Sequence, residues 1–268
     1  MSFLKKLIKR TNDDNRKVLS VFVTAGFPTL ESTISVCSAI YDAGADIIEL
    51  GIPFSDPLAD GPVIQTASQT ALENGVTMEY IFKTSQSLKK NYPEKGLVLM
   101  GYSNPVMKYG LEKFLIQCKN SGVNGVILPD IPVEEFSDFY NGMIPEIDKI
   151  LLTTPVSSEE RIKTIDEIGS GFVYCVSILG TTGTRDDFEE DTLKNLERTR
   201  RIIKNNHMLI GFGISNAKSV QKFTPYCDGI IVGSAVIKAI ADDYSNKTEW
   251  DRTIELISEL SEARRVYN

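Results

Sequence analysis

Short runs of apolar and β-branched residues recur along the chain, and most are followed by a segment with the periodicity of an amphipathic helix. The apolar runs begin near Val18, Ile47, Leu97, Val126, Ile150, Phe172, Met208 and Ile230. Helical periodicity is predicted over residues 32–43, 80–90, 111–121, 133–143, 159–168, 192–205, 217–223 and 250–265. Eight strand–helix units predict an α/β fold, a closed parallel (β/α)8 barrel of the TIM-barrel type.

An open, doubly wound sheet is the competing architecture, but the chain lacks a dinucleotide-binding signature, which favours the barrel. The second and sixth units are longer than their neighbours, so we expect insertions after strands 2 and 6. The first ten residues have the pattern of an extra amphipathic helix and lack the apolar run of a signal peptide. No linker or low-complexity segment interrupts the pattern. We therefore expect residues 1–268 to form a single TIM-barrel domain.

Composition narrows the class of partner. The 268 residues carry a formal net charge of −7, which argues against non-specific binding to nucleic acid or to anionic lipid. No uninterrupted apolar segment is long enough to span a membrane. The four cysteines are widely spaced and form no CxxC motif, so a cytoplasmic protein with a small-molecule ligand is expected.

The second predicted strand contains a carboxylate. Alternation along the strand places Ile48 and Leu50 under the helices and Glu49 on the opposite face, inside the barrel. Burial raises the pKa of a carboxyl group toward the range useful for proton transfer. A structural ion pair is the alternative. The position at the carboxyl end of a barrel strand favours catalysis, because TIM barrels keep their active sites there.

The segment that follows, residues 51–62, contains three prolines, two glycines and two aspartates, and it predicts a stiffened loop. Asp56 and Asp60 fit turn positions equally well. Together with Glu49, however, an aspartate on this loop predicts a pair of carboxylates that approach a substrate from two sides as acid and base.

Two glycine clusters predict a phosphate site. Gly211-Phe212-Gly213 follows strand 7 and Gly233-Ser234 follows strand 8, each before a helical pattern, and helix N-termini at these strands bind phosphate in many TIM barrels. Plain strand-to-helix turns are the alternative. Residues 180–185, rich in Gly and Thr, either close over the site or form a surface loop.

Two aromatic side chains, Phe22 and Tyr174, are predicted to form the walls of a pocket or to pack in the core. His207 is the only histidine, and it precedes strand 7, so a histidine-based metal site is not expected. No lysine falls at the carboxyl end of a predicted strand, which leaves a Schiff-base mechanism without its residue. With a metal site and a Schiff base disfavoured, acid/base catalysis by carboxylates on a phosphorylated small molecule is the remaining mechanism.

Several sequence blocks resemble the tryptophan synthase α subunit family across nearly the whole chain. The long block ELGIPFSDPLADGP is the most specific of them. The blocks are VFVTAGFP (21–28), DIIELGIPFSDPLADGPVIQ (46–65), MGYSNP (100–105), GVILPDIP (125–132), FVYCVS (172–177), GTTGTR (180–185), GFGIS (211–215) and IVGSAVIK (231–238). Phe27 is a departure, because many relatives carry Asp between Gly26 and Pro28.

The resemblance implies a carbon–carbon lyase that cleaves indole-3-glycerol phosphate into indole and glyceraldehyde 3-phosphate. It implies that Glu49 is the general acid and base and that Asp60 holds the indole N1–H. It further implies substrate-binding roles for eight residues. Those that bind the phosphate or close over it are Thr182, Gly183, Phe212, Gly213, Gly233 and Ser234, and those that enclose the indole are Phe22 and Tyr174.

The same resemblance implies a partner, the tryptophan synthase β subunit, usually in an α2β2 heterotetramer that converts the indole to tryptophan. Pyridoxal phosphate is then expected on the β subunit, with no cofactor or metal on this chain. The expected contact regions are residues 53–60 and the turns around Asn104 and Asp130. Two other readings stay open: an idle barrel that only activates the β chain, and a stand-alone indole-releasing lyase.

Overall fold

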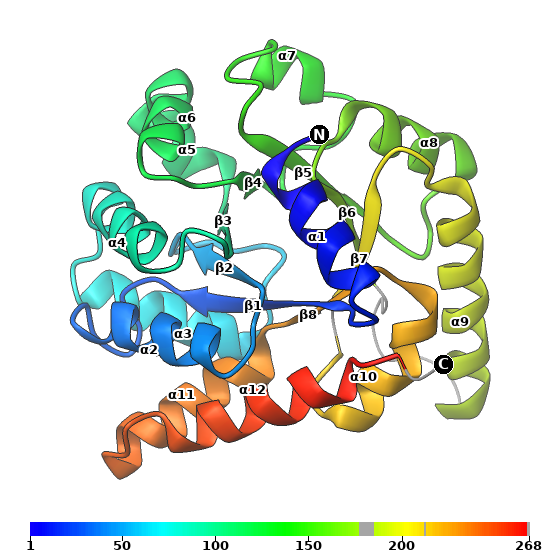
Figure 1. Ribbon diagram of the computed structural model, residues 1–268. Coiled ribbons are helices and arrows are strands. Elements are labelled where there is room, and N and C mark those ends of the chain that lie inside the picture. The colour runs from blue at the N-terminus through cyan, green and yellow to red at the C-terminus, as the bar shows by residue number, and fades with distance from the viewer. Residues whose placement is uncertain (177–184, 212, 267–268) are drawn as a thin grey trace.

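The computed structural model describes residues 1–176, 185–211 and 213–266, with the backbone alone described at residues 185–190 (Figure 1). The predictions for Thr182, Gly183 and Phe212 fall outside the described residues.

Eight parallel strands close into a barrel in chain order, because β1 pairs with both β2 and β8. The closed order confirms the predicted (β/α)8 barrel and excludes the open sheet. The strands are β1 Val18–Thr24, β2 Ile47–Gly51, β3 Gly96–Met100, β4 Gly125–Ile127, β5 Asp148–Thr153, β6 Phe172–Val176, β7 His207–Gly211 and β8 Gly229–Val232.

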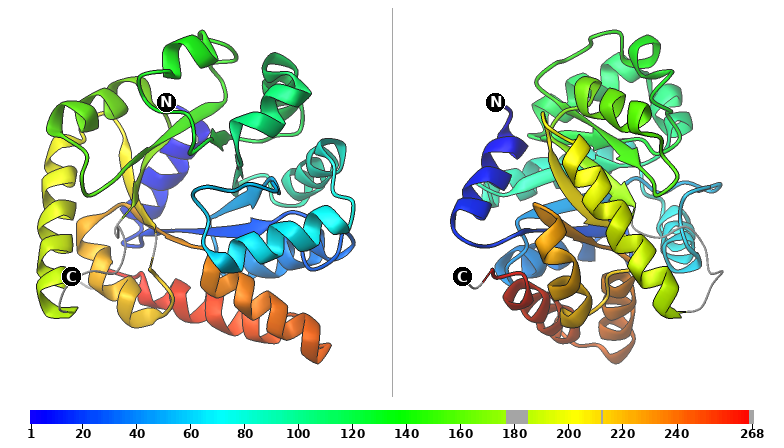
Figure 2. Two further views of the ribbon diagram at one scale, coloured as in Figure 1. Left: turned by 180° about the vertical axis from the view of Figure 1, so that it is seen from behind. Right: turned by 90° about the vertical axis from the view of Figure 1, so that its right-hand side faces the viewer.

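The helices surround the barrel, apart from α1, which lies across one end of it (Figures 1 and 2). In chain order they are α1 Phe3–Asp13, α2 Ser32–Asp42, α3 Pro62–Glu73, α4 Met78–Asn91, α5 Ser103–Tyr109, α6 Leu111–Asn120, α7 Phe136–Tyr140, α8 Glu159–Ile168, α9 Arg185–Ile202, α10 Ala217–Phe223, the 3₁₀ turn η1 Thr224–Tyr226, α11 Ser234–Asn246 and α12 Asp251–Ala263.

The helix predictions are wrong at several places. Two helices, α3 and α5, are absent from the predicted set, and α9 begins at Arg185 rather than near residue 192. Helix α3 was missed because it buries mainly small residues, Ala67, Ser68 and Ala71, which leave a weak apolar period. Helix α7 is shorter than predicted, because Asn141 adopts a left-handed conformation with φ of 42° and ends it.

The apolar core has two layers. One lies between the strands and the outer helices and contains Ile48 and Leu50. The other fills the barrel itself and contains Ile47 and Val98, together with side chains of α1 such as Leu4. Helix α1 therefore closes the amino-terminal end of the barrel, which leaves the carboxyl ends of the strands for a ligand.

Polar contacts also fasten the closed end. Arg264, after α12, is only 1% exposed and forms an ion pair with Asp46, just before β2. Its guanidinium also donates to the carbonyl oxygens of Lys17 at 2.7 Å and Gly44 at 2.8 Å. The C-terminal segment is thereby tied to the start of the first two strands. No helix in the described part of the chain is long and apolar enough to cross a bilayer.

Candidate functional site

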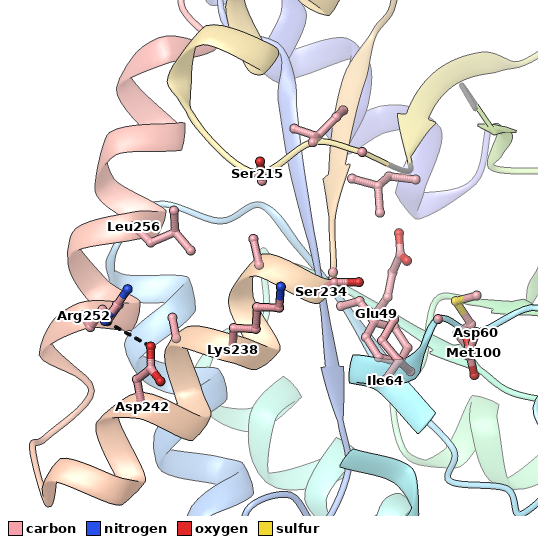
Figure 3. Close-up of a pocket in the computed structure, with 18 of the residues that line it drawn as sticks. Glu49, Asp60, Ile64, Met100, Ser215, Ser234, Lys238, Asp242, Arg252 and Leu256 are labelled. Atoms are coloured by element: carbon pink, nitrogen blue, oxygen red, sulfur yellow. Dashed lines mark ion pairs between the residues drawn. The ribbon is translucent and has the colours of Figure 1, made fainter. Parts of the chain in front are cut away.

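A cavity of about 740 Å³ opens at the carboxyl ends of the strands (Figure 3). Side chains from β1, β2, β3, β6 and β8 form its inner part, and the outer part reaches between α11 and α12. The predicted site residues that line it are Phe22, Glu49, Asp60, Tyr174, Gly213, Gly233 and Ser234. The structure thus brings together the described site residues that the resemblance implied, whereas Gly211, predicted with the glycine clusters, does not line the cavity.

Glu49 lies at the inner part of this cavity and is 0% exposed. The Ser20 hydroxyl donates a hydrogen bond of 2.7 Å to Oε1, whereas Oε2 is buried without a partner. Burial raises the pKa of Glu49 to about 7, and the hydrogen bond from Ser20 opposes part of that rise. Within the described chain Glu49 makes no ion pair, so the structural ion-pair alternative finds no support.

Asp60 enters the same cavity from the loop between β2 and α3. Burial raises its pKa, and a hydrogen bond with the Tyr102 side chain opposes the rise by favouring the ionised form. The Tyr102 hydroxyl also accepts a 3.0 Å hydrogen bond from the Ala59 backbone amide, which fixes the loop beside the carboxylate. Asp56, in contrast, is exposed and does not line the cavity. The geometry therefore selects Asp60 from the two candidate aspartates.

Phe22 and Tyr174 are both buried at the cavity, and each needs a glycine on the neighbouring strand. A Cβ atom at Gly51 would lie 2.5 Å from Cζ of Phe22. A Cβ atom at Gly211 would lie 2.4 Å from the Tyr174 hydroxyl. The absence of side chains at these two strand ends gives the aromatic walls their space.

At the glycine-rich rim after β7 and β8, the two helix N-termini differ in their capping. Gly233 and Ser234 begin α11, which has no side-chain cap, so the start of this helix can face a ligand. The sequence suggested a similar role for the helix after Gly213. In the structure Asn216 and Ser219 cap α10 reciprocally, and the backbone at Gly213 lines the cavity without that helix's amides. The anion site is therefore expected at α11.

Several residues at the site were missed from the sequence. Ser20 interrupts an apolar strand on the face that also carries Phe22, and that was the available signal. The sequence holds no comparable signal for Tyr102, because its contact with the loop after β2 depends on tertiary packing. Among the described residues no group of three His, Cys, Asp or Glu side chains could hold a metal ion.

The class of protein follows from the fold and the position of the cavity. A closed (β/α)8 barrel with a buried carboxyl group at the carboxyl ends of its strands is typical of TIM-barrel enzymes, which build their active sites there.

Comparisons with known proteins identify the family. The family model for the tryptophan synthase alpha chain matches residues 8–265. The tryptophan synthase alpha chain of Petrotoga mobilis is 47% identical over 87% of this chain and 90% of its own length. That of a Thermoanaerobacter species is 43% identical over 98% and 99%. The crystal structure of the α subunit from Legionella pneumophila aligns with a TM-score of 0.88 at 30% identity, covering 98% of each chain.

The chain belongs to the tryptophan synthase α chain family. It is a lyase of tryptophan biosynthesis that cleaves indole-3-glycerol phosphate, as the resemblance of the sequence blocks implied. The pyridoxal phosphate of tryptophan synthase belongs to the β subunit and not to this chain.

The raised pKa of Glu49 predicts a pH-dependent stability. The folded state holds the Glu49 proton more tightly than the unfolded state, where the pKa is near 4.5. The stability that this tighter binding adds to the folded state is therefore lost as the pH rises from 4.5 through about 7. A shift of this size is worth about 3 kcal/mol. The Glu49→Gln side chain cannot ionise, so we expect the variant to keep this stability at all pH values. The free energy of unfolding of the variant minus that of the unsubstituted chain should therefore be about 3 kcal/mol larger above neutral pH than near pH 4.

Urea unfolding across this pH range measures the effect. Glu112→Gln is the matched control, because Glu112 is exposed in the first turn of α6. Parallel pH profiles for the Glu49→Gln variant and the unsubstituted chain would contradict the assignment.

Proposed function

We propose that Glu49 and Asp60 carry out the cleavage together, Glu49 as the general acid and base and Asp60 as the carboxylate that holds the indole N1–H. The observation that supports this most strongly is the buried, unpartnered Oε2 atom of Glu49 in a cavity that Asp60 also lines. The two carboxyl groups have different surroundings, since Glu49 has a single hydroxyl partner and Asp60 lies beside Tyr102 on a loop. Such differences allow one carboxyl group to be protonated while another is ionised.

The proposed reaction begins with Glu49 protonated. Its carboxyl group donates a proton to C3 of the indole, and the positive charge that forms at N1 is opposed by the Asp60 carboxylate, which accepts a hydrogen bond from N1–H. The Glu49 carboxylate then takes the proton of the hydroxyl group on the adjacent glycerol carbon. The bond between C3 and that carbon breaks, its electron pair returns to the ring, and the hydroxyl carbon becomes the aldehyde. Glu49 ends the cycle protonated.

The phosphate group of the substrate is proposed to bind at the N-terminus of α11. The backbone at Gly213 and Gly233 and the Ser234 hydroxyl face the cavity there, and the helix dipole favours an anion. Thr182, Gly183 and Phe212 are proposed to complete and close this site. Phe22 and Tyr174 are proposed to enclose the indole ring, which explains why two glycines leave room for them.

We further propose that the chain acts with a tryptophan synthase β subunit in an α2β2 assembly. Two exposed apolar side chains beside the expected contact regions support this: Leu58 is 92% exposed on the loop after β2, and Met107 is 64% exposed on α5. Asp130, also in an expected contact region, accepts hydrogen bonds from the backbone and side chain of Ser103. Solved relatives include structures of tryptophan synthase from Mycobacterium tuberculosis.

The cellular location and the domain organisation are each proposed on one observation. All four cysteines are buried and free, which suits a reducing cytoplasm. One barrel accounts for all eight strands of the residues that the structure describes, which supports a single domain over residues 1–268.

A turnover assay without any β subunit tests the acid/base proposal. The unsubstituted chain is expected to release indole from indole-3-glycerol phosphate, and Glu49→Gln is expected to lose at least about 100-fold in kcat, because general acid–base catalysis supplies factors of this order. Inhibition by inorganic phosphate should be unchanged in the variant. Near-normal turnover by Glu49→Gln would refute the role of Glu49, and an inert unsubstituted chain would favour the idle-barrel alternative.

Addition of the cognate β subunit tests the partnership. Co-elution in size-exclusion chromatography is expected, together with a faster α reaction, because a partner that orders the loop after β2 also places Asp60. Leu58→Ser should weaken co-elution, whereas Tyr244→Ser, a substitution of another exposed large side chain near the C-terminal end of α11, should not. Separate elution of the unsubstituted chains would support the stand-alone lyase.

A further inference from the structure

The proposed substrate is a dianion, yet the cavity is rich in acidic side chains. Its described lining contains five carboxyl groups, those of Glu49, Asp60, Asp242, Glu255 and Glu259, and two cationic groups, those of Lys238 and Arg252. The chain as a whole carries a net charge of −7. A phosphate group entering this cavity therefore needs a local positive charge beyond that of the helix dipole.

Arg252 cannot supply the missing charge freely. Its guanidinium pairs with the Asp242 carboxylate at 3.0 Å, on the side of the cavity away from Glu49 (Figure 3). Asp242 is also the residue four positions after Lys238 on α11, where a helical lysine ordinarily finds an acidic partner. Arg252 pairs with that partner, and Lys238 has no hydrogen bond or ion pair with any residue that the structure describes.

Lys238 instead extends toward the proposed phosphate site. Figure 3 shows its ammonium group on the side of Ser234 rather than that of Asp242. Ser234 begins α11 and lies one helical turn before Lys238, so the two side chains share a face of the helix. Lys238 is exposed, so the lack of a partner within the protein is ordinary for it. Its place on the cavity wall beside Ser234, in a lining with more acidic than basic side chains, is what points to a ligand of opposite charge.

We propose that Lys238 is a positioning residue whose ammonium group attracts and orients the phosphate of the substrate at the N-terminus of α11. This inference rests on the proposed function, because it takes the phosphorylated substrate and its place at Ser234 from there. Lys238 acts on the non-reacting end of the substrate, so its charge contributes to binding and leaves the proton transfers at Glu49 unchanged.

Steady-state kinetics of Lys238→Gln test the proposal. The KM for indole-3-glycerol phosphate is expected to rise by about threefold, the order expected for a charge contact of an exposed side chain, with kcat nearly unchanged. The inhibition constant of inorganic phosphate should rise in parallel, and Lys238→Arg should restore both values. The unphosphorylated analogue indole-3-glycerol should not distinguish the variant from the unsubstituted chain.

Lys218→Gln provides the control, because it removes the same charge from exposed Lys218 at the start of α10, outside the cavity. Its kinetics should match those of the unsubstituted chain. An unchanged KM in Lys238→Gln, or equal losses with the phosphorylated and unphosphorylated substrates, would overturn the inference about Lys238. Absence of turnover in the unsubstituted chain would instead overturn the proposed function itself.

Discussion

The desolvation of one carboxyl group is the constraint on which the rest of the site depends. Glu49 is fully buried among apolar side chains inside the barrel, and its hydrogen bond with Ser20 stabilises the charged form only in part. Ionisation is therefore costly in this position, and the pKa rises into the neutral range. A carboxyl group that holds its proton near pH 7 can first donate that proton and then recover one within a single cycle.

The barrel tolerates a buried carboxyl group because the contacts that stabilise the fold and the residues of the proposed site lie at opposite ends of it. Helix α1 and the ion pair between Arg264 and Asp46 close and fasten the amino-terminal end. The carboxyl end is left to glycines, a proline-rich loop and an uncapped helix N-terminus, none of which would strengthen a core. The residues proposed to anchor the phosphate and those proposed for the chemistry line one continuous cavity, an arrangement in which binding at one end would position the bond that breaks at the other.

Alternation along β2 was enough to predict that Glu49 points into the barrel, because the period of a strand leaves only two choices and Ile48 and Leu50 settle which is outward. The barrel itself followed from the recurrence of strand–helix units. The chemistry of the loop could not choose between Asp56 and Asp60, and only the family resemblance named Asp60, because its contact with Tyr102, a residue distant along the chain, is a tertiary one. Nor could the sequence show that Asn216 caps α10 while α11 stays open, or that Arg252 takes the partner of Lys238. These outcomes depend on tertiary contacts.

The ionisation of Glu49 itself is the most direct test of this account. The side-chain carboxyl carbon can be followed by ¹³C NMR in a chain labelled at glutamate, with its signal assigned by its loss in Glu49→Gln. The account predicts a titration midpoint near pH 7 in the free chain. A midpoint near the ordinary value of 4.5 would mean that Glu49 is ionised at neutral pH and cannot begin the reaction as an acid.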